Sequence, residues 1–272
     1  MDVNLYSTMT ILIGEFKKPA LTINSTNSLL DAREIMIKNN ISRLIVEKNS
    51  NPIGIITEKG IGRMVYNKTT LPLDKITVSK VMNSPLITIT DNTPLEKCAS
   101  IMLSKKISSF VINGKPTGII TKSDLVKIYA DQFQNLKSVN QYMTKNVHTV
   151  LSSHSIHRAL TIMLKKRVSR IVVIRNNKPI GIITQRDMMP ITAFIDDKKA
   201  KSETLFQIGH ILLAKDIMND PIIIRNNSDL AQAARIMRDN KISGVPVIDS
   251  EENLVGILTK TDIIKAIRDI KT

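Results

Sequence analysis

Three aspartates follow a threonine at a spacing of three residues, each time directly after an apolar Gly-Ile-Ile or Gly-Ile-Leu run. The pairs are Thr121 and Asp124, Thr184 and Asp187, and Thr259 and Asp262. A carboxylate at the start of a helix can close a capping box with the threonine. It can instead accept hydrogen bonds from the two hydroxyls of a ribose, while the positive helix end and the threonine hydroxyl face a phosphate. Capping explains the aspartate only in part, because Glu or Gln would serve equally, so we favour the sugar-binding role for at least one pair.

A fourth copy of the segment departs from this pattern. Gly54-Ile55-Ile56-Thr57 is followed by Gly60 where the other copies carry Asp. A hydrogen bond to a charged group is worth about 1.5 to 3 kcal/mol, so its loss would weaken binding roughly tenfold or more. We predict that the site of this copy is empty or altered.

These segments are the last part of a longer repeat. An Ile-Met pair precedes each of them, at Ile35-Met36, Ile101-Met102, Ile162-Met163 and Ile236-Met237. Five residues after each Met stands Ile or Val followed by Ser, and nineteen or twenty residues before it stand Phe16, Met82, Met143 and Met218. We therefore place four repeats of about 55 residues, called repeats 1 to 4, at residues 8–70, 76–134, 137–195 and 212–270.

The first half of each repeat has the pattern of a strand followed by a helix. In repeat 2, residues 86–89 are an apolar strand, and Thr93-Pro94-Leu95-Glu96 predicts a capping box with Pro at the first helical position. Apolar residues at Leu95, Ala99, Met102 and Leu103 predict a helix with one buried face.

The second half of the repeat predicts two strands and a second helix. In repeat 2, residues 107–112 and 118–120 are apolar runs joined by Asn113-Gly114-Lys115-Pro116, which is typical of a hairpin. Thr121 then begins a helix over residues 122 to about 132, with Leu125, Val126 and Ile128 as candidates for its inner face.

Repeat 3 differs from the others after its aspartate. Pro190 predicts that the helix following Asp187 is short or kinked. Residues 196–201 are almost all charged and are predicted to belong to a longer connector between repeats 3 and 4.

The repeat resembles the cystathionine β-synthase (CBS) domain. The best match is Ile242-Ser243-Gly244-Val245-Pro246-Val247, followed by Gly256 and by Thr259 and Asp262, and all four repeats match over nearly the whole chain. The resemblance implies an α/β (α+β) fold of four CBS domains in two pseudo-twofold Bateman modules, repeats 1 and 2 in one and repeats 3 and 4 in the other. In such modules adenosyl ligands bind in clefts between the paired domains. Modules commonly associate as flat dimers, so a homodimer is expected.

The resemblance also implies roles for single residues. In repeat 4 it places Thr259 toward a phosphate, Asp262 on the ribose, and the backbone of Gly244, Val245 and Pro246 against the adenine, beside Ser243. The matching residues are Thr184, Asp187, Ser169 and Arg170 in repeat 3, and Thr121 and Asp124 in repeat 2. Neither of these repeats has the Gly-Val-Pro step, so the surface that would contact the adenine is less defined in them. The implied ligands are AMP, ADP, ATP or S-adenosylmethionine, acting as regulators and not as catalytic cofactors.

Positive charge is concentrated in repeat 3. The chain has a net charge of +15, and residues 137–195 hold ten basic residues against one acid, Asp187. Such a potential attracts polyphosphate ligands or a nucleic-acid backbone, although a solvated basic face is an equal alternative. The planar guanidinium groups of Arg170 and Arg186 suit phosphate binding, with plain solvent exposure as the alternative for each. Only 3% of the residues are aromatic, which disfavours stacking on single strands and leaves contact with duplex phosphates as the mode of any nucleic-acid binding.

Other chemistry is not indicated by the sequence. The single cysteine, Cys98, lies among helix residues and is expected to be a buried small hydrophobe, in line with a reducing, cytoplasmic setting. His148, His154 and His157 have no carboxylate or thiol that completes a metal set, and no nucleophile stands beside a base, so we expect neither a metal site nor an enzyme. No apolar run approaches the roughly 20 residues of a membrane helix, and we expect no membrane insertion.

Three functions remain open at this point. The first is a regulatory sensor that binds an adenine nucleotide and changes its shape or its contacts with an unidentified protein partner. The second is binding of duplex nucleic acid through repeat 3. The third is a scaffold without ligand that serves a partner enzyme or transporter.

Overall fold

The computed structural model describes residues 10–66, 71–112, 118–187 and 211–270. Each repeat contains a short strand, a helix and a hairpin of two strands, and in repeats 1, 2 and 4 a second helix follows directly. Repeat 1 comprises β2 (Thr22–Asn24), α1 (Leu29–Lys38), β3 (Arg43–Lys48), β4 (Asn51–Thr57) and α2 (Glu58–Tyr66). Repeat 2 comprises β5 (Thr88–Ile89), α3 (Leu95–Ser104), β6 (Ser109–Ile112), β7 (Gly118–Thr121) and α4 (Lys122–Gln132).

The other two repeats follow the same plan. Repeat 3 comprises β8 (Thr149–Leu151), α6 (Ile156–Lys165), β9 (Arg170–Arg175) and β10 (Lys178–Thr184). Repeat 4 comprises β11 (Ile224–Arg225), α10 (Leu230–Asp239), β12 (Gly244–Ile248), β13 (Leu254–Thr259) and α11 (Lys260–Arg268). The predicted loop at residues 113–116, the effect of Pro190 and the connector at residues 196–201 lie outside the described residues.

The sheet of each repeat combines parallel and antiparallel pairing. The first strand runs parallel to the second, and the second and third form an antiparallel hairpin. In repeat 2 the register pairs Thr88 with Val111 and Ser109 with Thr121, so the start of the middle strand lies opposite the head of the second helix. The predicted order of elements and the helix over residues 122–132 are confirmed, and Leu125, Val126 and Ile128 are buried.

The start of the first helix in repeat 2 differs from the prediction. Helix α3 begins at Leu95, and Pro94 is an extended N-cap (ψ 148°) without a side-chain hydrogen bond, so the predicted capping box at Thr93 is wrong. The reason is tertiary. The amide of Leu95 donates to the carbonyl of Ile11, and the carbonyl of Thr93 accepts from Ile13, which holds these residues extended against the N-terminal segment.

The spacing of five residues after each Met has a local cause. The amide of Ile41 donates to the carbonyl of Met36 at 2.9 Å, and the same bond links Ile107 to Met102 and Val168 to Met163. The residue before each of these amides has a positive φ, for example 50° at Asn40 and 54° at Lys106. This is a Schellman motif, in which one left-handed residue ends the helix and the next apolar residue folds back on it.

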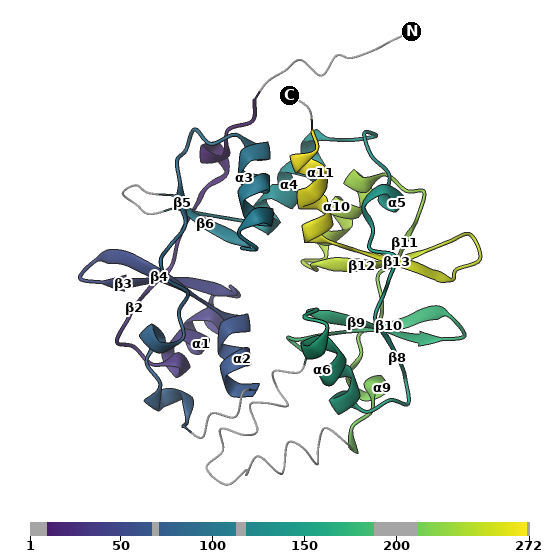
Figure 1. The fold of residues 1–272 in the computed structure, drawn as a ribbon, viewed down its shortest axis with the longest axis horizontal. Helices are drawn as coiled ribbons and strands as arrows, with labels where there is room; N and C mark the ends of the chain where they lie inside the picture. Colours follow the sequence, from purple (N-terminus) through teal and green to yellow (C-terminus); the bar gives the residue numbers. More distant parts are fainter. Residues whose placement is uncertain (1–9, 67–70, 113–117, 188–210, 271–272) are drawn as a thin grey trace. The chain divides into compact units, whose positions relative to one another are not determined.

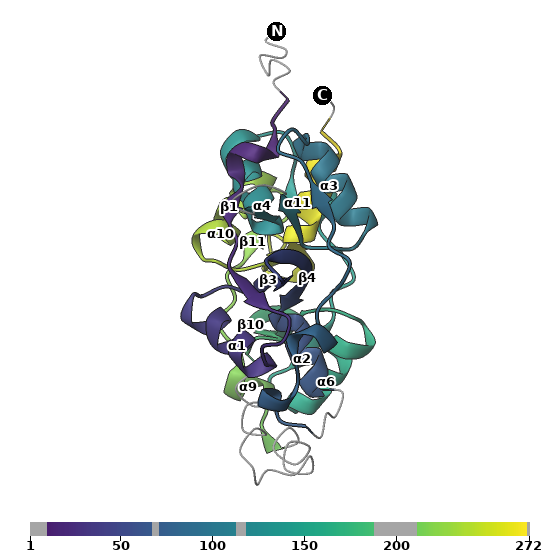
Figure 2. The ribbon, with the colours of Figure 1, turned by 90° about the vertical axis from the view of Figure 1, so that its left-hand side faces the viewer.

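Linkers cross between neighbouring repeats. The backbone of Asn83, in the first part of repeat 2, pairs with Ile55 of repeat 1, whereas β1 (Lys18–Pro19), in the first part of repeat 1, pairs with β7 of repeat 2. In the same way Thr144, in the first part of repeat 3, pairs with Ile257 of repeat 4, and Asn219, in the first part of repeat 4, pairs with Ile182 of repeat 3. The purple N-terminal segment therefore lies among the blue elements of repeat 2 (Figure 2).

These crossings explain the glycine of the repeated segment. A Cβ atom added to Gly54 would lie 2.6 Å from the sulfur of Met82, and one added to Gly256 would lie 2.5 Å from that of Met143. Gly181 faces Met218 as closely. The Met of each crossing linker therefore packs on a strand of the other repeat at a position where any residue with a Cβ atom would clash with it.

The chain divides into two compact units. Unit 1 contains Met1–Pro19, Ile87–Val147 and Ile222–Thr272, and unit 2 contains Ala20–Leu86 and His148–Pro221. Unit 1 thus holds the larger part of repeats 2 and 4, and unit 2 that of repeats 1 and 3, while the first part of each repeat belongs to the other unit. None of the helices in the described part of the chain is long and apolar enough to span a membrane.

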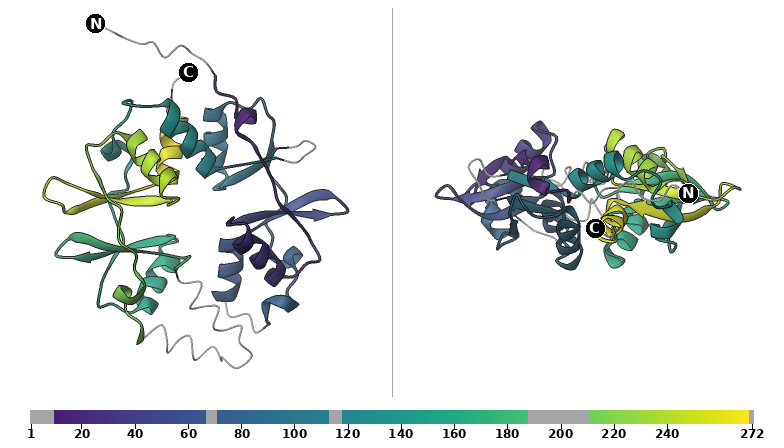
Figure 3. Two further views of the ribbon diagram at one scale, coloured as in Figure 1. Left: turned by 180° about the vertical axis from the view of Figure 1, so that it is seen from behind. Right: turned by 90° about the horizontal axis from the view of Figure 1, so that it is seen from above.

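Unit 1 has one continuous core that joins its two repeats. Helix α4 packs on α10 and α11, and α3 packs on α11, as Figure 1 and the left view of Figure 3 show. Residues from both repeats form the same buried cluster, among them Cys98, Tyr129, Met237 and Ile263. The expected burial of Cys98 is confirmed, because none of its surface is exposed.

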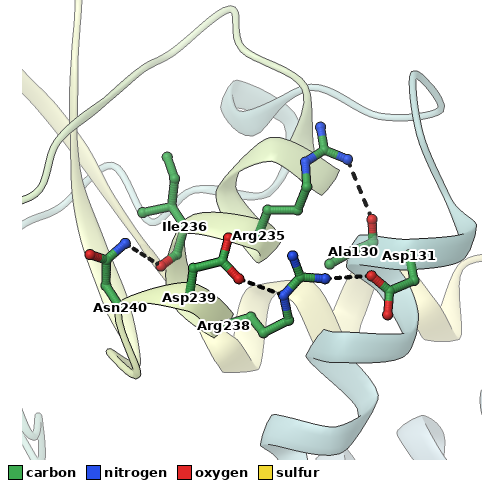
Figure 4. Close-up of polar contacts among 7 residues, drawn as sticks. All are labelled: Ala130, Asp131, Arg235, Ile236, Arg238, Asp239 and Asn240. Carbon is green, nitrogen blue, oxygen red and sulfur yellow. Dashed lines mark hydrogen bonds and ion pairs between the residues drawn. The ribbon is translucent and has the colours of Figure 1, made fainter.

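Polar contacts join the ends of these helices in unit 1. Figure 4 shows Arg238 of α10 between Asp239 of its own helix and Asp131 of α4, while Arg235 reaches the carbonyl of Ala130 at 3.4 Å. All three ion-pairing side chains are at least 31% exposed, so the pairs contribute little stability and mainly fix the register of α10 on α4.

Candidate ligand site at the heads of the second helices

Asp262 is a buried carboxylate with both oxygens bound. Its Oδ2 accepts from the amide of Thr259 at 2.9 Å and from the Thr259 hydroxyl at 2.7 Å, and its Oδ1 accepts from Lys265 Nζ at 2.8 Å. The residue is 2% exposed. The inner oxygen therefore closes the capping box, and the outer oxygen is directed to a cation.

The two other aspartates repeat this geometry. Asp124 Oδ2 accepts from the amide and hydroxyl of Thr121 at 2.8 and 2.7 Å, and the residue is 5% exposed. Asp187 Oδ2 accepts from the same groups of Thr184 at 2.7 and 2.6 Å. Capping and ligand binding do not exclude each other, because capping uses only one of the two carboxylate oxygens.

Repeat 1 has no carboxylate at this position. The amide of Gly60 donates to Thr57 Oγ1 at 3.1 Å, so the threonine alone caps α2. The start of α2 therefore has a backbone like that of the other helix heads but lacks the aspartate.

The serine of the repeat lies beside each helix head. The carbonyl of Ser243 accepts from the amide of Lys260 at 3.2 Å, and that of Ser169 accepts from Gln185 at 3.0 Å. The hairpin register adds Gly244 opposite Thr259 and Arg170 opposite Thr184. The structure therefore brings together Ser243, Gly244, Thr259 and Asp262 in repeat 4, and Ser169, Arg170, Thr184 and Asp187 in repeat 3.

The Gly-Val-Pro step forms the buried middle strand of repeat 4. Gly244, Val245 and Pro246 are all buried in β12, between β11 and β13. A proline without an amide fits there because Ile257, opposite Pro246, exchanges both of its backbone hydrogen bonds with Thr144 of the crossing linker. Their predicted role toward adenine stays a prediction.

In unit 1 the two helix heads exchange lysine contacts. Lys122 Nζ donates to Thr261 Oγ1 at 3.0 Å, and Lys260 Nζ donates to Ser123 Oγ at 2.8 Å. Each lysine is the first residue of its helix, and each acceptor is the second residue of the other. The heads of α4 and α11 therefore meet in a pseudo-twofold arrangement.

Unit 2 has the same juxtaposition with different residues. Arg186, the second residue after Thr184, pairs with Glu58, the first residue of α2, at 2.8 Å, which raises the pKa of Arg186. The pKa of Lys59 is lowered, first by desolvation of its ammonium group and then by the charges of Arg63 and Arg170, although much of the side chain reaches solvent. Cations from repeats 1 and 3 therefore gather closely enough to repel one another.

Sequence reasoning missed the lysines that bind the aspartates. The pairing of Lys265 with Asp262 could have been predicted from the sequence, since Lys265 lies one helical turn after Asp262. Lys18 has none, because it lies 106 positions before Asp124 and reaches it only through the pairing of β1 with β7. Arg170 and Arg186 were expected near phosphates, whereas the role of Glu58 was not foreseen.

A family model described as the CBS domain matches residues 13–65, 78–131, 139–191 and 214–269. The chain belongs to the CBS domain family.

Its relatives include stand-alone CBS proteins. Protein MJ1225 of Methanocaldococcus jannaschii is 23% identical over 269 residues, which cover 91% of this chain and 95% of that protein. The crystal structure of MJ1225 has a TM-score of 0.76 at 22% identity and covers 94% of this chain and 99% of that one. This likeness confirms the predicted fold class, α/β with four CBS domains of the Bateman type.

Two other relatives are similar over part of the chain. Protein MJ1404 of the same organism is 32% identical over 192 residues, which are 66% of this chain and only 45% of that protein. CBSX2, a chloroplastic CBS protein of Arabidopsis thaliana, is 26% identical over 154 residues, or 49% of this chain and 65% of that protein. CBSX2 has been crystallised in complex with AMP.

Proposed function

We propose that this CBS protein is a non-enzymatic, cytoplasmic sensor that binds an adenine nucleotide at the heads of its second helices. The observation that carries the proposal is the burial of the Asp124 and Asp262 carboxylates together with the contacts of their two oxygens. Both are buried carboxylates whose inner oxygen is fixed by a threonine and whose outer oxygen is paired with a lysine that a ligand could replace. A relative with AMP bound, CBSX2, supports the choice of ligand.

The ribose is assigned to the outer carboxylate oxygens. Paired hydroxyls donating to a buried carboxylate are charge-assisted hydrogen bonds, which are about twice as strong as neutral ones. Repeat 4 has the complete residue set, with Gly244, Val245 and Pro246 beside Thr259 and Asp262. Repeats 2 and 3 keep the Thr-Asp pair without the Gly-Val-Pro step, and repeat 1 has Gly60, so we expect at most three occupied sites.

The phosphates are assigned to the cations next to these sites. In unit 2 the pKa of Lys59 is lowered first by desolvation and then by the charges of Arg63 and Arg170, and a phosphate would offset that repulsion. Arg170 and Arg186 offer planar donors for it. In unit 1 the first residues of the helices, Lys122 and Lys260, are the corresponding cations. A ligand of the size of a nucleoside monophosphate, at roughly 0.3 kcal/mol for each of about 23 heavy atoms, would bind with about 7 kcal/mol, near the micromolar range.

Signalling would follow from a shift in population. A ligand favours the arrangement that binds it more tightly, and it shifts the equilibrium only by that difference in affinity. The readout would be a change in contacts within a homodimer or with a protein partner.

Thermal unfolding with AMP, ADP, ATP and S-adenosylmethionine tests the proposal. A ligand at 100 times its Kd stabilises by about 2.7 kcal/mol, and we expect this for at least one of the four. The double variant Asp187→Ala and Asp262→Ala should lose the part of the response that repeats 3 and 4 supply, while the Asp124 site of repeat 2 remains. Asp31→Ala is the matched control, because Asp31 closes a similar capping box with Ser28 on the first helix of repeat 1. An equal ligand response in the double variant and in the control would reject the sites.

Binding of duplex nucleic acid is a second candidate. Lys165, Lys166 and Arg167 are exposed at the end of α6, and Arg175 and Lys178 are exposed at the hairpin of repeat 3. Contacts of this kind are made to phosphates and weaken steeply with salt.

A further inference from the structure

The aspartates of unit 1 already hold a cation on the oxygen that a ribose would use. Asp124 Oδ1 lies 2.6 Å from Lys18 Nζ, and Asp262 Oδ1 lies 2.8 Å from Lys265 Nζ. A sugar hydroxyl can reach these oxygens only by replacing the ammonium group or by sharing the oxygen with it.

The ammonium group of Lys18 can move away from Asp124 without a change in the fold. Its backbone is fixed, because Lys18 and Pro19 pair with Ile119 and Gly118, and the neighbouring Lys17 binds both oxygens of Asp91 at 2.8 and 2.9 Å. Its side chain is 63% exposed, whereas that of Asp124 is 5% exposed. The ammonium group can therefore rotate into solvent while the strand stays in place.

Lysines at two positions can neutralise each of these aspartates. Lys18 stands two residues after Phe16, and the matching residue for repeat 4 is Lys145, two residues after Met143. Lys127 and Lys265 each stand three residues after the aspartate. Repeat 2 uses the linker lysine and repeat 4 uses the helix lysine, although each sequence contains both.

Repeat 3 has neither lysine. The two positions hold Asp220 and Pro190 around Asp187. A lysine at either of these two positions is therefore a property of the repeats in unit 1, and the Thr-Asp capping box forms in repeat 3 without one.

We propose that Lys18 is a specificity-determining residue of the repeat 2 site, a built-in counterion that favours phosphorylated nucleosides over bare ones. The inference rests on the proposed function. A neutral nucleoside must break the pair between Lys18 and Asp124 without giving the ammonium a new anion. A nucleotide brings a phosphate that the released ammonium can bind, so the loss of one ion pair is offset by another.

Calorimetric titration with adenosine and with AMP tests this role. The background carries Asp187→Asn and Asp262→Asn, which leaves Asp124 as the one intact aspartate of the three. In this background Lys18→Met should bind adenosine at least threefold more tightly and AMP at least threefold more weakly, so that the AMP preference falls about tenfold. Lys17→Met, one residue away and paired with Asp91, should change both affinities less than twofold. Lys18→Arg should retain the AMP preference.

The outcomes separate the inference from the proposed function. If the background protein binds AMP and its AMP preference is the same with Lys18→Met as with Lys17→Met, the proposed role of Lys18 is wrong and the proposed function stands. A background protein that binds neither compound, while the chain with all three aspartates also binds none, overturns the proposed function together with this role. When Asp124→Asn is added to both lysine variants, Lys18→Met and Lys17→Met should show the same preference for AMP over adenosine. A difference that persists without Asp124 also counts against the inference.

Discussion

Replacing Gly256 by alanine should destabilise the protein, because the crossing linker leaves no room for a methyl group. The new Cβ would lie 2.5 Å from Met143 Sδ, 3.0 Å from its Cγ and 3.3 Å from its Cβ. Carbon and sulfur need more than 3.5 Å, so the methionine must move by about 1 Å or more. Overpacking of this kind costs about 1 to 3 kcal/mol, and each kcal/mol lowers the Tm of a chain of this size by about 2 to 4 °C.

Urea unfolding followed by circular dichroism measures this effect. Gly60→Ala is the matched control, because within the described ranges its new Cβ comes close to Thr57 Oγ1 alone, at 3.3 Å, and alanine is the better helix former by about 1 kcal/mol. We therefore expect the two glycine variants to change stability in opposite directions.

A double-mutant cycle assigns the cost to the linker. Met143→Ala opens the space, so Gly256→Ala should cost at least about 0.5 kcal/mol less in that background than in the wild type. Additive effects of the two substitutions, or a Gly256→Ala protein as stable as the wild type, would refute the crossed packing of Met143 on repeat 4.

Further predictions concern the core and the charged surface. Among the described residues the buried hydroxyl of Tyr129 has no hydrogen-bond partner, so Tyr129→Phe should raise the free energy of unfolding by about 1 kcal/mol in urea titrations, and a loss of stability would show that the hydroxyl is satisfied. Burial raises the pKa of the Cys98 thiol to about 12, so its contribution to stability is complete below the unfolded pKa of about 8.5 and is lost as the pH rises above it. Between pH 8 and pH 10 this loss amounts to about 2 kcal/mol, and Cys98→Ala should remove that part of the pH dependence. If duplex DNA binds, reversing the charges of Lys165, Lys166 and Arg167 should abolish the binding, and an unchanged affinity in an electrophoretic shift assay would exclude this surface.

Local patterns predicted much of the fold. Thr121 and the apolar residues after it place α4 at its observed bounds, because a cap and a buried stripe are encoded within a few residues. The Ile-Met pair and the apolar residue five positions later likewise form a local motif that ends the first helix of repeats 1, 2 and 3. Repetition strengthened these assignments, since the same pattern recurs in each repeat.

Features that depend on distant contacts were not predicted. Pro94 resembles a first helical residue, yet pairing with residues 11–13 keeps it extended. The glycine of the segment indicated a repeat without revealing its methionine partner, because that partner comes from another linker. Lys18 was missed for the same reason: its approach to Asp124 requires a strand of the N-terminal segment to join the sheet of repeat 2.

Native mass spectrometry with AMP tests the central claim most directly. Asp124, Asp187 and Asp262 are proposed to hold the sugar, so the wild-type chain should retain between one and three AMP molecules, and a variant with all three residues changed to Asn should retain none. A wild-type chain that carries no nucleotide, or a triple variant that carries as many as the wild type, would contradict the account.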